Sequence, residues 1–229
     1  SWGGEVCNVS VLVCVGVNME GFREVLGVVE GAKEDHESWL CFLRHLKSRG
    51  LTGVRLAVSD KCLGLVEALA ESYPEALWQR CAVHFYRNVF SVVPHNRLAE
   101  VAMMLKTIHA QEDRQAAEDK IKVIVAKLSD RKLHAAAKVV SEGAHETLSY
   151  YAFPQSHWRH LRTNNPLERI MKEIRRRTRV VGSFPDGESA LMLVAARLRH
   201  ISGTRWGTRL YMNMQRLCEC DEMEALTTA

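Results

Sequence analysis

The chain has 229 residues, 47% of them hydrophobic and 25% charged, a composition typical of a folded globular protein and not of a disordered one. Lysine and arginine number 31 against 27 acids, and this net charge of +4 is too small by itself to indicate a polyanionic partner. The seven cysteines are odd in number and scattered, so we expect reduced thiols and a cytoplasmic protein. The longest apolar stretch, residues 9–17, is too short to cross a bilayer, and no basic leader precedes it.

The first third of the chain alternates between strand and helix patterns. Residues 9–17 are rich in β-branched side chains, and residues 22–29 follow a turn at 18–21, which predicts a β-hairpin. The following segments predict a helix over 39–49, a strand over 54–60, a helix over 61–72 and a strand over 76–83. This alternation predicts an α/β domain.

The middle of the chain has a different pattern of apolar residues. Residues 94–150 show helical apolar stripes and no strand pattern, which predicts a helical insertion. Two further helices are expected over 165–179 and 186–201, followed by a tail from 204 to 229.

Asp60 stands where a predicted strand ends and a predicted helix begins. A carboxylate at the carboxyl end of a strand can face a ligand cleft, since α/β proteins bind ligands at that edge of the sheet. The alternative is that Asp60 is the N-cap of the following helix, a position that aspartate favours.

Glu168 has a similar alternative. Asn165 as N-cap, Pro166 at the first helical position and Glu168 three residues after the cap would form a capping box, which needs no further function. The cap does not account for the basic residues that follow Glu168.

Between residues 162 and 179 there are seven basic residues and two acids. Arg162 precedes the predicted helix, and the helix itself carries Arg169, Lys172, Arg175, Arg176, Arg177 and Arg179. Such a helix suits contacts with the phosphates of DNA. A solvated basic face is the alternative.

Cys81 and His84 have the two-residue spacing of a pair of zinc ligands. One pair is half of a zinc site, which Cys218 and Cys220 could complete. The alternative is a cysteine at the end of a strand and a histidine at the start of a helix.

Several blocks of this sequence, in this order, resemble the Mutator-type transposases of bacterial insertion sequences. The blocks span residues 16–27, 49–60, 64–65, 78–88, 157–158, 165–169 and 176–185. Cys62 and Met171 differ from the resemblance, because the family more often has His and Asn there.

The resemblance implies a ribonuclease-H-like mixed sheet with a helical insertion before the last catalytic helix. The catalytic core would comprise residues 1–93 and 151–203, and the insertion residues 94–150. Asp60 and Glu168 match the second and third acids of a catalytic Asp-Asp-Glu set that binds two Mg²⁺ or Mn²⁺ ions. Cys81 and His84 match the family's Cys-x-x-His element.

The resemblance also implies the activity and the partners: cleavage of DNA strands and their transfer to target DNA, by an enzyme assembled as a pair or larger in the bacterial nucleoid. The strand with the first aspartate would lie upstream of the matching segment and at the centre of the sheet, between the strands at 9–17 and 54–59. We therefore expect a chain truncated at its start, without that acid and strand, and impaired in activity. The alternative is a non-catalytic DNA-binding or oligomerisation remnant of a transposase.

Overall fold

The computed structural model of the chain describes residues 10–31 and 35–219, which fall into two compact units. Unit 1 contains the described residues up to Arg55, residues 62–76 and the described residues from Asn164 onward. Unit 2 contains residues 56–61 and 77–163. The predicted catalytic core of residues 1–93 and 151–203 stays a prediction.

Unit 1 is built around the predicted β-hairpin. Strands β1 (Ser10–Val17) and β2 (Arg23–Gly31) pair antiparallel. Asn18 shapes the turn, because its side-chain oxygen accepts hydrogen bonds from the amides of Glu20 and Phe22. Gly21 follows with a φ of +88°, and a Cβ there would collide with the carbonyl of Met212. The turn therefore requires glycine at that position.

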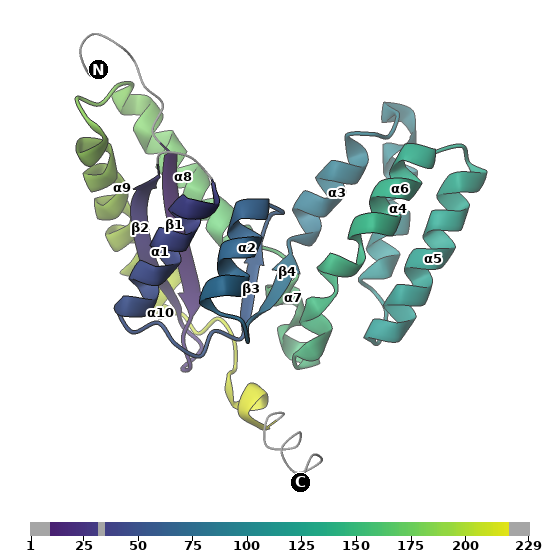
Figure 1. Cartoon of the computed structure of the whole chain (residues 1–229), viewed down its shortest axis with the longest axis horizontal. Coiled ribbons are helices and arrows are strands. Elements are labelled where there is room, and N and C mark those ends of the chain that lie inside the picture. The colour runs from purple at the N-terminus through teal and green to yellow at the C-terminus, as the bar shows by residue number, and fades with distance from the viewer. Residues whose placement is uncertain (1–9, 32–34, 220–229) are drawn as a thin grey trace. The chain divides into compact units, whose positions relative to one another are not determined.

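The two faces of the hairpin are buried against different helices (Figure 1). Leu12 packs with the apolar side chains of α1 (His36–Ser48) and α2 (Leu63–Ser72). Val13, the next residue, packs with those of α8 (Asn165–Val181) and α9 (Gly187–Ser202). Successive strand side chains point to opposite faces, so both faces of a short hairpin become core. The short helix α10 (Arg205–Thr208) follows α9.

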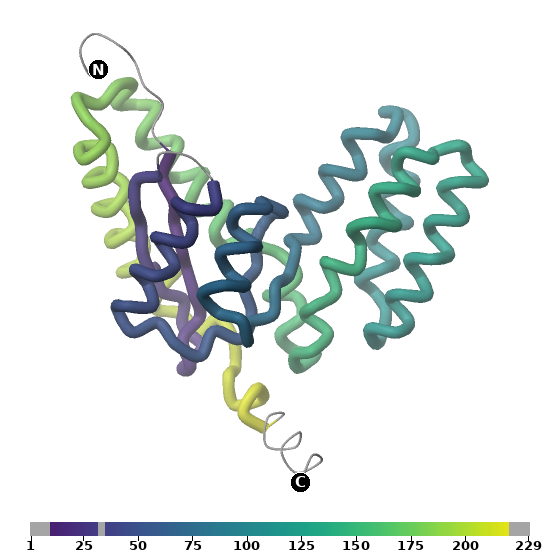
Figure 2. The backbone as a smooth tube through the Cα atoms, viewed as in Figure 1, coloured from purple at the N-terminus to yellow at the C-terminus, as the bar shows by residue number. Residues whose placement is uncertain are grey.

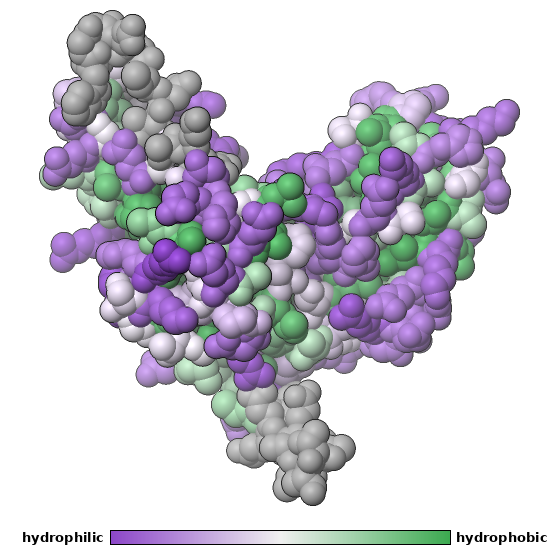
Figure 3. Space-filling view, in the orientation of Figure 1, coloured by the Kyte–Doolittle hydropathy of each residue, from purple (hydrophilic) through white to green (hydrophobic). Residues whose placement is uncertain are grey.

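Unit 2 contains a second, parallel strand pair and a helical bundle. Strands β3 (Leu56–Ser59) and β4 (Leu77–Arg80) run parallel. The bundle helices are α3 (Ala82–Phe90), α4 (Leu98–Ile108), α5 (Arg114–Asp130) and α6 (His134–Gly143), which lie side by side in Figure 2. Buried residues such as Phe85, Leu105 and Leu128 form their common core. Hydrophilic side chains cover much of the bundle face seen in Figure 3.

Within the bundle, the 3-10 helix His95–Arg97 joins α3 to α4. The elements of unit 2 that follow α6 lead along the chain to unit 1. They are the 3-10 helices His145–Thr147, Ser149–Ala152 and Gln155–His157, and the helix α7 (Trp158–Leu161). The prediction of helical structure over 94–150 is confirmed. None of the helices in residues 10–31 and 35–219 is both long and apolar enough to span a membrane.

One of the predicted strands needs correction. The strand predicted over 76–83 ends at Arg80, because Ala82 already belongs to α3, whose Phe85 and Val89 follow the helical spacing that fills the bundle core. The prediction of a mixed sheet that lacks its central strand is confirmed in part: the fold is α/β, and the described strands form one antiparallel and one parallel pair. The ribonuclease-H-like arrangement stays a prediction.

Candidate functional site

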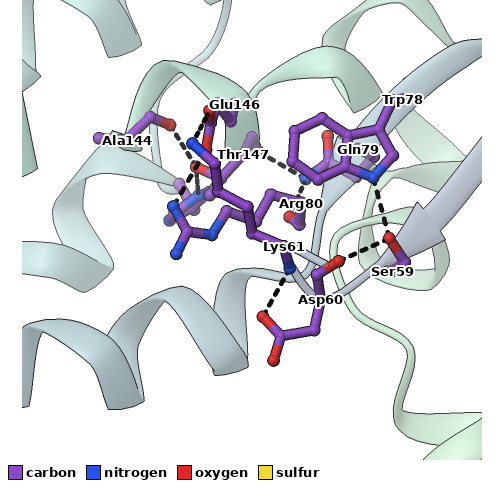
Figure 4. Close-up of polar contacts among 10 residues, drawn as sticks. Ser59, Asp60, Lys61, Trp78, Gln79, Arg80, Ala144, Glu146 and Thr147 are labelled. Carbon is purple, nitrogen blue, oxygen red and sulfur yellow. Dashed lines mark hydrogen bonds and ion pairs between the residues drawn. The ribbon is translucent and has the colours of Figure 1, made fainter. Parts of the chain in front are cut away.

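Asp60 directly follows β3 and its side chain is exposed. Its Oδ1 accepts a hydrogen bond from the backbone amide of Lys61 at 2.7 Å (Figure 4). The N-cap of α2 is Cys62, so the interpretation of Asp60 as that cap is wrong. Aspartates do cap other helices in the expected way, namely Asp35 at α1, Asp113 at α5 and Asp186 at α9. Asp60 thus sits at a strand end without a capping role.

The backbone that carries Asp60 is fixed by hydrogen bonds on its β3 side. The indole Nε1 of Trp78, in the neighbouring strand, donates to Ser59 Oγ at 2.9 Å. Ser59 Oγ in turn donates to the carbonyl of Asp60 at 2.7 Å. Position 60 therefore has an ordered main chain and an exposed carboxylate.

A network of charged side chains lies next to Asp60, and sequence reasoning missed it. Lys61 Nζ lies 2.5 Å from Glu146 Oε1, and Arg80 Nη1 lies 3.0 Å from Glu146 Oε2. Lys61 and Glu146 are 85 residues apart, so no local spacing points to the pair. Figure 4 shows these side chains beside the turn that holds Asp60.

Glu168 occupies the first turn of α8, but the predicted cap is displaced by one residue. Asn164, not Asn165, is the N-cap, because its carbonyl accepts the first helical hydrogen bonds from the amides of Leu167 and Glu168. Asn164 makes no capping bond with its side chain. The predicted capping box centred on Asn165 is therefore wrong, and Glu168 is half-buried in the first turn.

All six predicted DNA-binding cations of α8 are exposed, but they differ in their partners. Glu173 lies on the same helix and pairs with Arg176 at 2.9 Å and with Arg177 at 3.3 Å. It also accepts from Arg197 of α9 at 2.7 Å. The hydrogen bonds from Arg176 are the main cause that lowers the pKa of Glu173 to about 2. Part of the positive charge is thus neutralised within unit 1.

Three of the four cations without such partners, Lys172, Arg175 and Arg179, form a stripe. Within the described part of the chain, Arg169, Lys172, Arg175 and Arg179 make no ion pair with an acid. Glu168, Lys172, Arg175 and Arg179 are spaced by four, three and four residues, which places them along one face of a helix. The opposite face carries Ile170 and Ile174, which are buried. We call this exposed face of α8, from Glu168 to Arg179, the basic stripe.

Cys81 and His84 lie where the alternative to a zinc site places them, after the end of a strand and at the start of a helix. Cys81 is buried and is the N-cap of α3, and His84 lies in the first turn of that helix. The described ranges contain no group of three or more His, Cys, Asp and Glu side chains arranged to hold a metal ion. Cys220 lies outside the described residues, so the four-ligand zinc site with Cys218 is not tested.

The carboxylates of Asp60 and Glu168 fit a divalent metal by their chemistry. Both are hard oxygen donors, the kind that Mg²⁺ and Mn²⁺ prefer. The amide of Lys61 occupies one site on Oδ1 of Asp60, and an ionised carboxylate accepts at about four. Asp60 belongs to unit 2 and Glu168 to unit 1, and their sharing of one metal site stays a prediction.

Comparison with known proteins places the chain in a family. The family described as "Transposase, Mutator family" matches residues 2–206. The chain is similar to the transposase of insertion sequence element IS1081 from Mycobacterium tuberculosis, with 40% identity over 85% of this chain and 47% of that protein. It is 38% identical to the ISRM5 transposase of Rhizobium meliloti, over 94% of this chain and 54% of the relative. It is 32% identical to the IS256 transposase of transposon Tn4001 from Staphylococcus aureus, over 92% of this chain and 54% of that protein.

The chain spans about half the length of these curated relatives. The matching residues include both units, with Asp60, the Cys81–His84 pair, Glu168 and all six cations of α8. The resemblance inferred from the sequence is thereby confirmed, and the chain belongs to the Mutator family of transposases.

Proposed function

We propose that this chain acts in DNA transposition as part of a metal-dependent transposase, with Asp60 and Glu168 as two of its metal-binding acids. In this proposal the basic stripe binds the phosphate backbone of DNA. Two divalent cations, when bound, would stabilise the attacking and leaving oxygens of phosphodiester cleavage and strand transfer. The relatives are named transposases of insertion sequence elements, and we carry this activity over to the chain as a proposal.

The observation that carries the proposal is the composition of the basic stripe. Glu168 stands at the first turn of α8, and Lys172, Arg175 and Arg179 follow it along the same face. A carboxylate there is not required by the cap, since Asn164 holds the N-cap position. A nucleic-acid backbone that follows the three cations would therefore pass beside Glu168.

The position of Asp60 supports the same function. It is an exposed acid at the carboxyl end of a parallel strand, where ligands bind in α/β folds. Its cap interpretation is excluded by Cys62. The Ser59 hydroxyl donates to its backbone carbonyl, and the Lys61 amide donates to its side-chain Oδ1. An acid held on an ordered main chain suits metal binding, because ligand geometry must be preorganised.

The experiment measures Mn²⁺ binding and strand cleavage together. The purified 229-residue chain is titrated with Mn²⁺ by electron paramagnetic resonance and then incubated with duplex DNA. We expect Asp60→Asn and Glu168→Gln each to weaken Mn²⁺ binding and to abolish any cleavage. Asp119→Asn and Glu188→Gln are matched controls, because they remove exposed acids of units 2 and 1 away from the proposed site. Mn²⁺ binding that is equal in all five proteins would contradict the proposal.

A second candidate function is DNA binding without cleavage, and the exposed cations of the basic stripe favour it. It predicts salt-dependent DNA binding that neither Asp60→Asn nor Glu168→Gln weakens, and no metal-dependent cleavage by the wild-type chain. The same set of variants therefore distinguishes the two functions.

A further inference from the structure

We propose that Glu146, which lies in the helical insertion, is a positioning residue that holds the Asp60 turn in its metal-binding conformation through Lys61. This inference rests on the proposed function for its purpose, but the contacts that carry it all lie within unit 2. The insertion would thus contribute directly to the geometry of the candidate site.

The first step is the pairing of Glu146 with two cations. One oxygen of Glu146 contacts Lys61 Nζ at 2.5 Å and the other contacts Arg80 Nη1 at 3.0 Å. The side chain of Arg80 is 8% exposed and that of Glu146 is 16% exposed, so this pair is largely shielded from water. Shielded charge-assisted hydrogen bonds are strong and directional, so they fix the carboxylate.

The second step is the way Arg80 itself is held. Its guanidinium lies 5.2 Å from the centre of the Phe85 ring. Gly143, the last residue of α6, leaves room for it, because a Cβ there would lie 2.7 Å from Arg80 Nη1. The Arg80 side chain is therefore fixed in position, and its ion pair with Glu146 holds the insertion beside it.

The third step joins the same segment of the insertion to strand β4. Buried Gln79 donates to the carbonyl of Thr147 at 2.8 Å and accepts from the amide of Tyr150 at 3.0 Å. Ser149 Oγ donates to the carbonyl of Trp78 at 2.6 Å. Residues 146–150 are thus fastened along β4, the strand that pairs with β3.

These contacts converge on both neighbours of Asp60. Trp78 holds Ser59 on one side, and Glu146 holds Lys61 on the other. The amide of Lys61 is the donor to Asp60 Oδ1, so the position of the Lys61 backbone helps to orient the carboxylate. The side chain of Lys61 is 36% exposed, more than those of Arg80 and Glu146, so Lys61 is the best position for a test.

The test compares Lys61→Met, Glu146→Gln and Lys61→Arg in the full chain, with Lys122→Met as the matched control. Lys122 forms a similar lysine–carboxylate pair with Asp119 on the surface of α5. The first readout is amide hydrogen exchange of residues 59–61 without metal, measured by NMR, and the second is Mn²⁺ affinity.

We expect Lys61→Met and Glu146→Gln to speed exchange of the Lys61 amide at least about tenfold, because local opening becomes easier. Both should weaken Mn²⁺ binding by about 10- to 100-fold, as the loss of an outer-shell partner does. Lys61→Arg should restore both readouts, and Lys122→Met should change neither.

Unchanged exchange at residues 59–61 in Lys61→Met overturns the positioning role, and this variant leaves the shielded Arg80–Glu146 pair intact. Mn²⁺ affinity that is unaffected by Asp60→Asn overturns the proposed function instead. Since exchange is measured without metal, the two failures are distinguishable.

Discussion

Lys61 and Glu146 form an ion pair with an Nζ–Oε1 distance of 2.5 Å, although 85 residues separate them in the sequence. Lys61 follows Asp60, and Glu146 lies in the 3-10 helix after α6. The pair therefore links the segment after β3, which carries a candidate catalytic acid, to the helical segment of residues 94–150, and both belong to one compact unit.

The shielded half of this network gives a prediction about stability. Glu146→Leu leaves the Arg80 guanidinium buried without its carboxylate, which should lower the free energy of unfolding of unit 2 by about 3–5 kcal/mol. Adding Arg80→Met should recover a substantial part of that loss, since an apolar pair has no charge to solvate. Urea unfolding of both single variants and the double variant measures this. Additive losses would contradict a coupled pair.

The division of cations on α8 gives a prediction about DNA binding. Arg175→Gln with Arg179→Gln removes two cations of the basic stripe, so the slope of log K against log salt should fall by about two. Arg176→Gln with Arg177→Gln removes the same charge from residues that Glu173 already pairs, and it should change the slope less. Fluorescence anisotropy with a labelled duplex at several salt concentrations measures both. Equal slopes for the two double variants would show that the ion pairs of Glu173 do not matter for binding.

Local patterns in the sequence predicted most elements of the fold. The hairpin, the helices α1, α2, α8 and α9 and the short strand before Asp60 all follow from local apolar periodicity. The strand predicted to continue to residue 83 shows the limit of this approach. Ala82 and Val83 are apolar in either structure, and their helical state is decided by Phe85 and Val89 in the bundle core.

The candidate site was predictable only as single residues. Asp60 and Glu168 could be identified by resemblance. Whether they cap helices instead could be judged only from the structure, in which the N-caps of α2 and α8 are Cys62 and Asn164. The pairing of Glu173 with Arg197 and of Glu146 with Lys61 joins different elements, and sequence spacing carries no signal for it. Which cations have no acidic partner is therefore information that comes from tertiary structure.

Gly64 belongs to the blocks that resemble the family, and the structure gives it a packing role. A Cβ at Gly64 would lie 2.5 Å from the backbone nitrogen of His36, so α2 can approach the start of α1 only with glycine there. Gly64→Ala should lower the stability of unit 1 by about 1–3 kcal/mol through overpacking. Gly203→Ala is the matched control: φ is −79° and the nearest neighbouring atom is 3.6 Å away. Thermal unfolding that is unchanged in Gly64→Ala would refute this role.

The last prediction concerns the pH dependence of unit 2 and the buried His109. Its Nε2 lies 2.9 Å from Thr147 Oγ1, and its Nδ1 lies 2.6 Å from the hydroxyl of Tyr86. Thr147 donates its own proton to the carbonyl of Ala144, so its oxygen accepts from His109 Nε2–H. The Tyr86 hydroxyl has a single proton and two acceptors within reach, Nδ1 of the neutral imidazole and the carbonyl of Leu105 at 3.0 Å.

Burial, aided by the charge of Arg162, lowers the pKa of His109 from 6.5 to about 4. Above pH 6.5 both the folded and the unfolded chain carry a neutral imidazole, and its contribution to stability is complete. Between pH 6.5 and about 4 the unfolded chain binds a proton that the folded chain does not. The free energy of unfolding therefore decreases as the pH is lowered through this range, by about 3 kcal/mol at most.

Urea unfolding between pH 4 and 7, followed at NMR resonances of α4 and α5, measures this loss. His109→Gln should be less stable at pH 7 but should lose less stability on acidification. His95→Gln, which removes an exposed histidine, should keep the wild-type profile. A wild-type profile in His109→Gln would show that another group causes the acid sensitivity of unit 2.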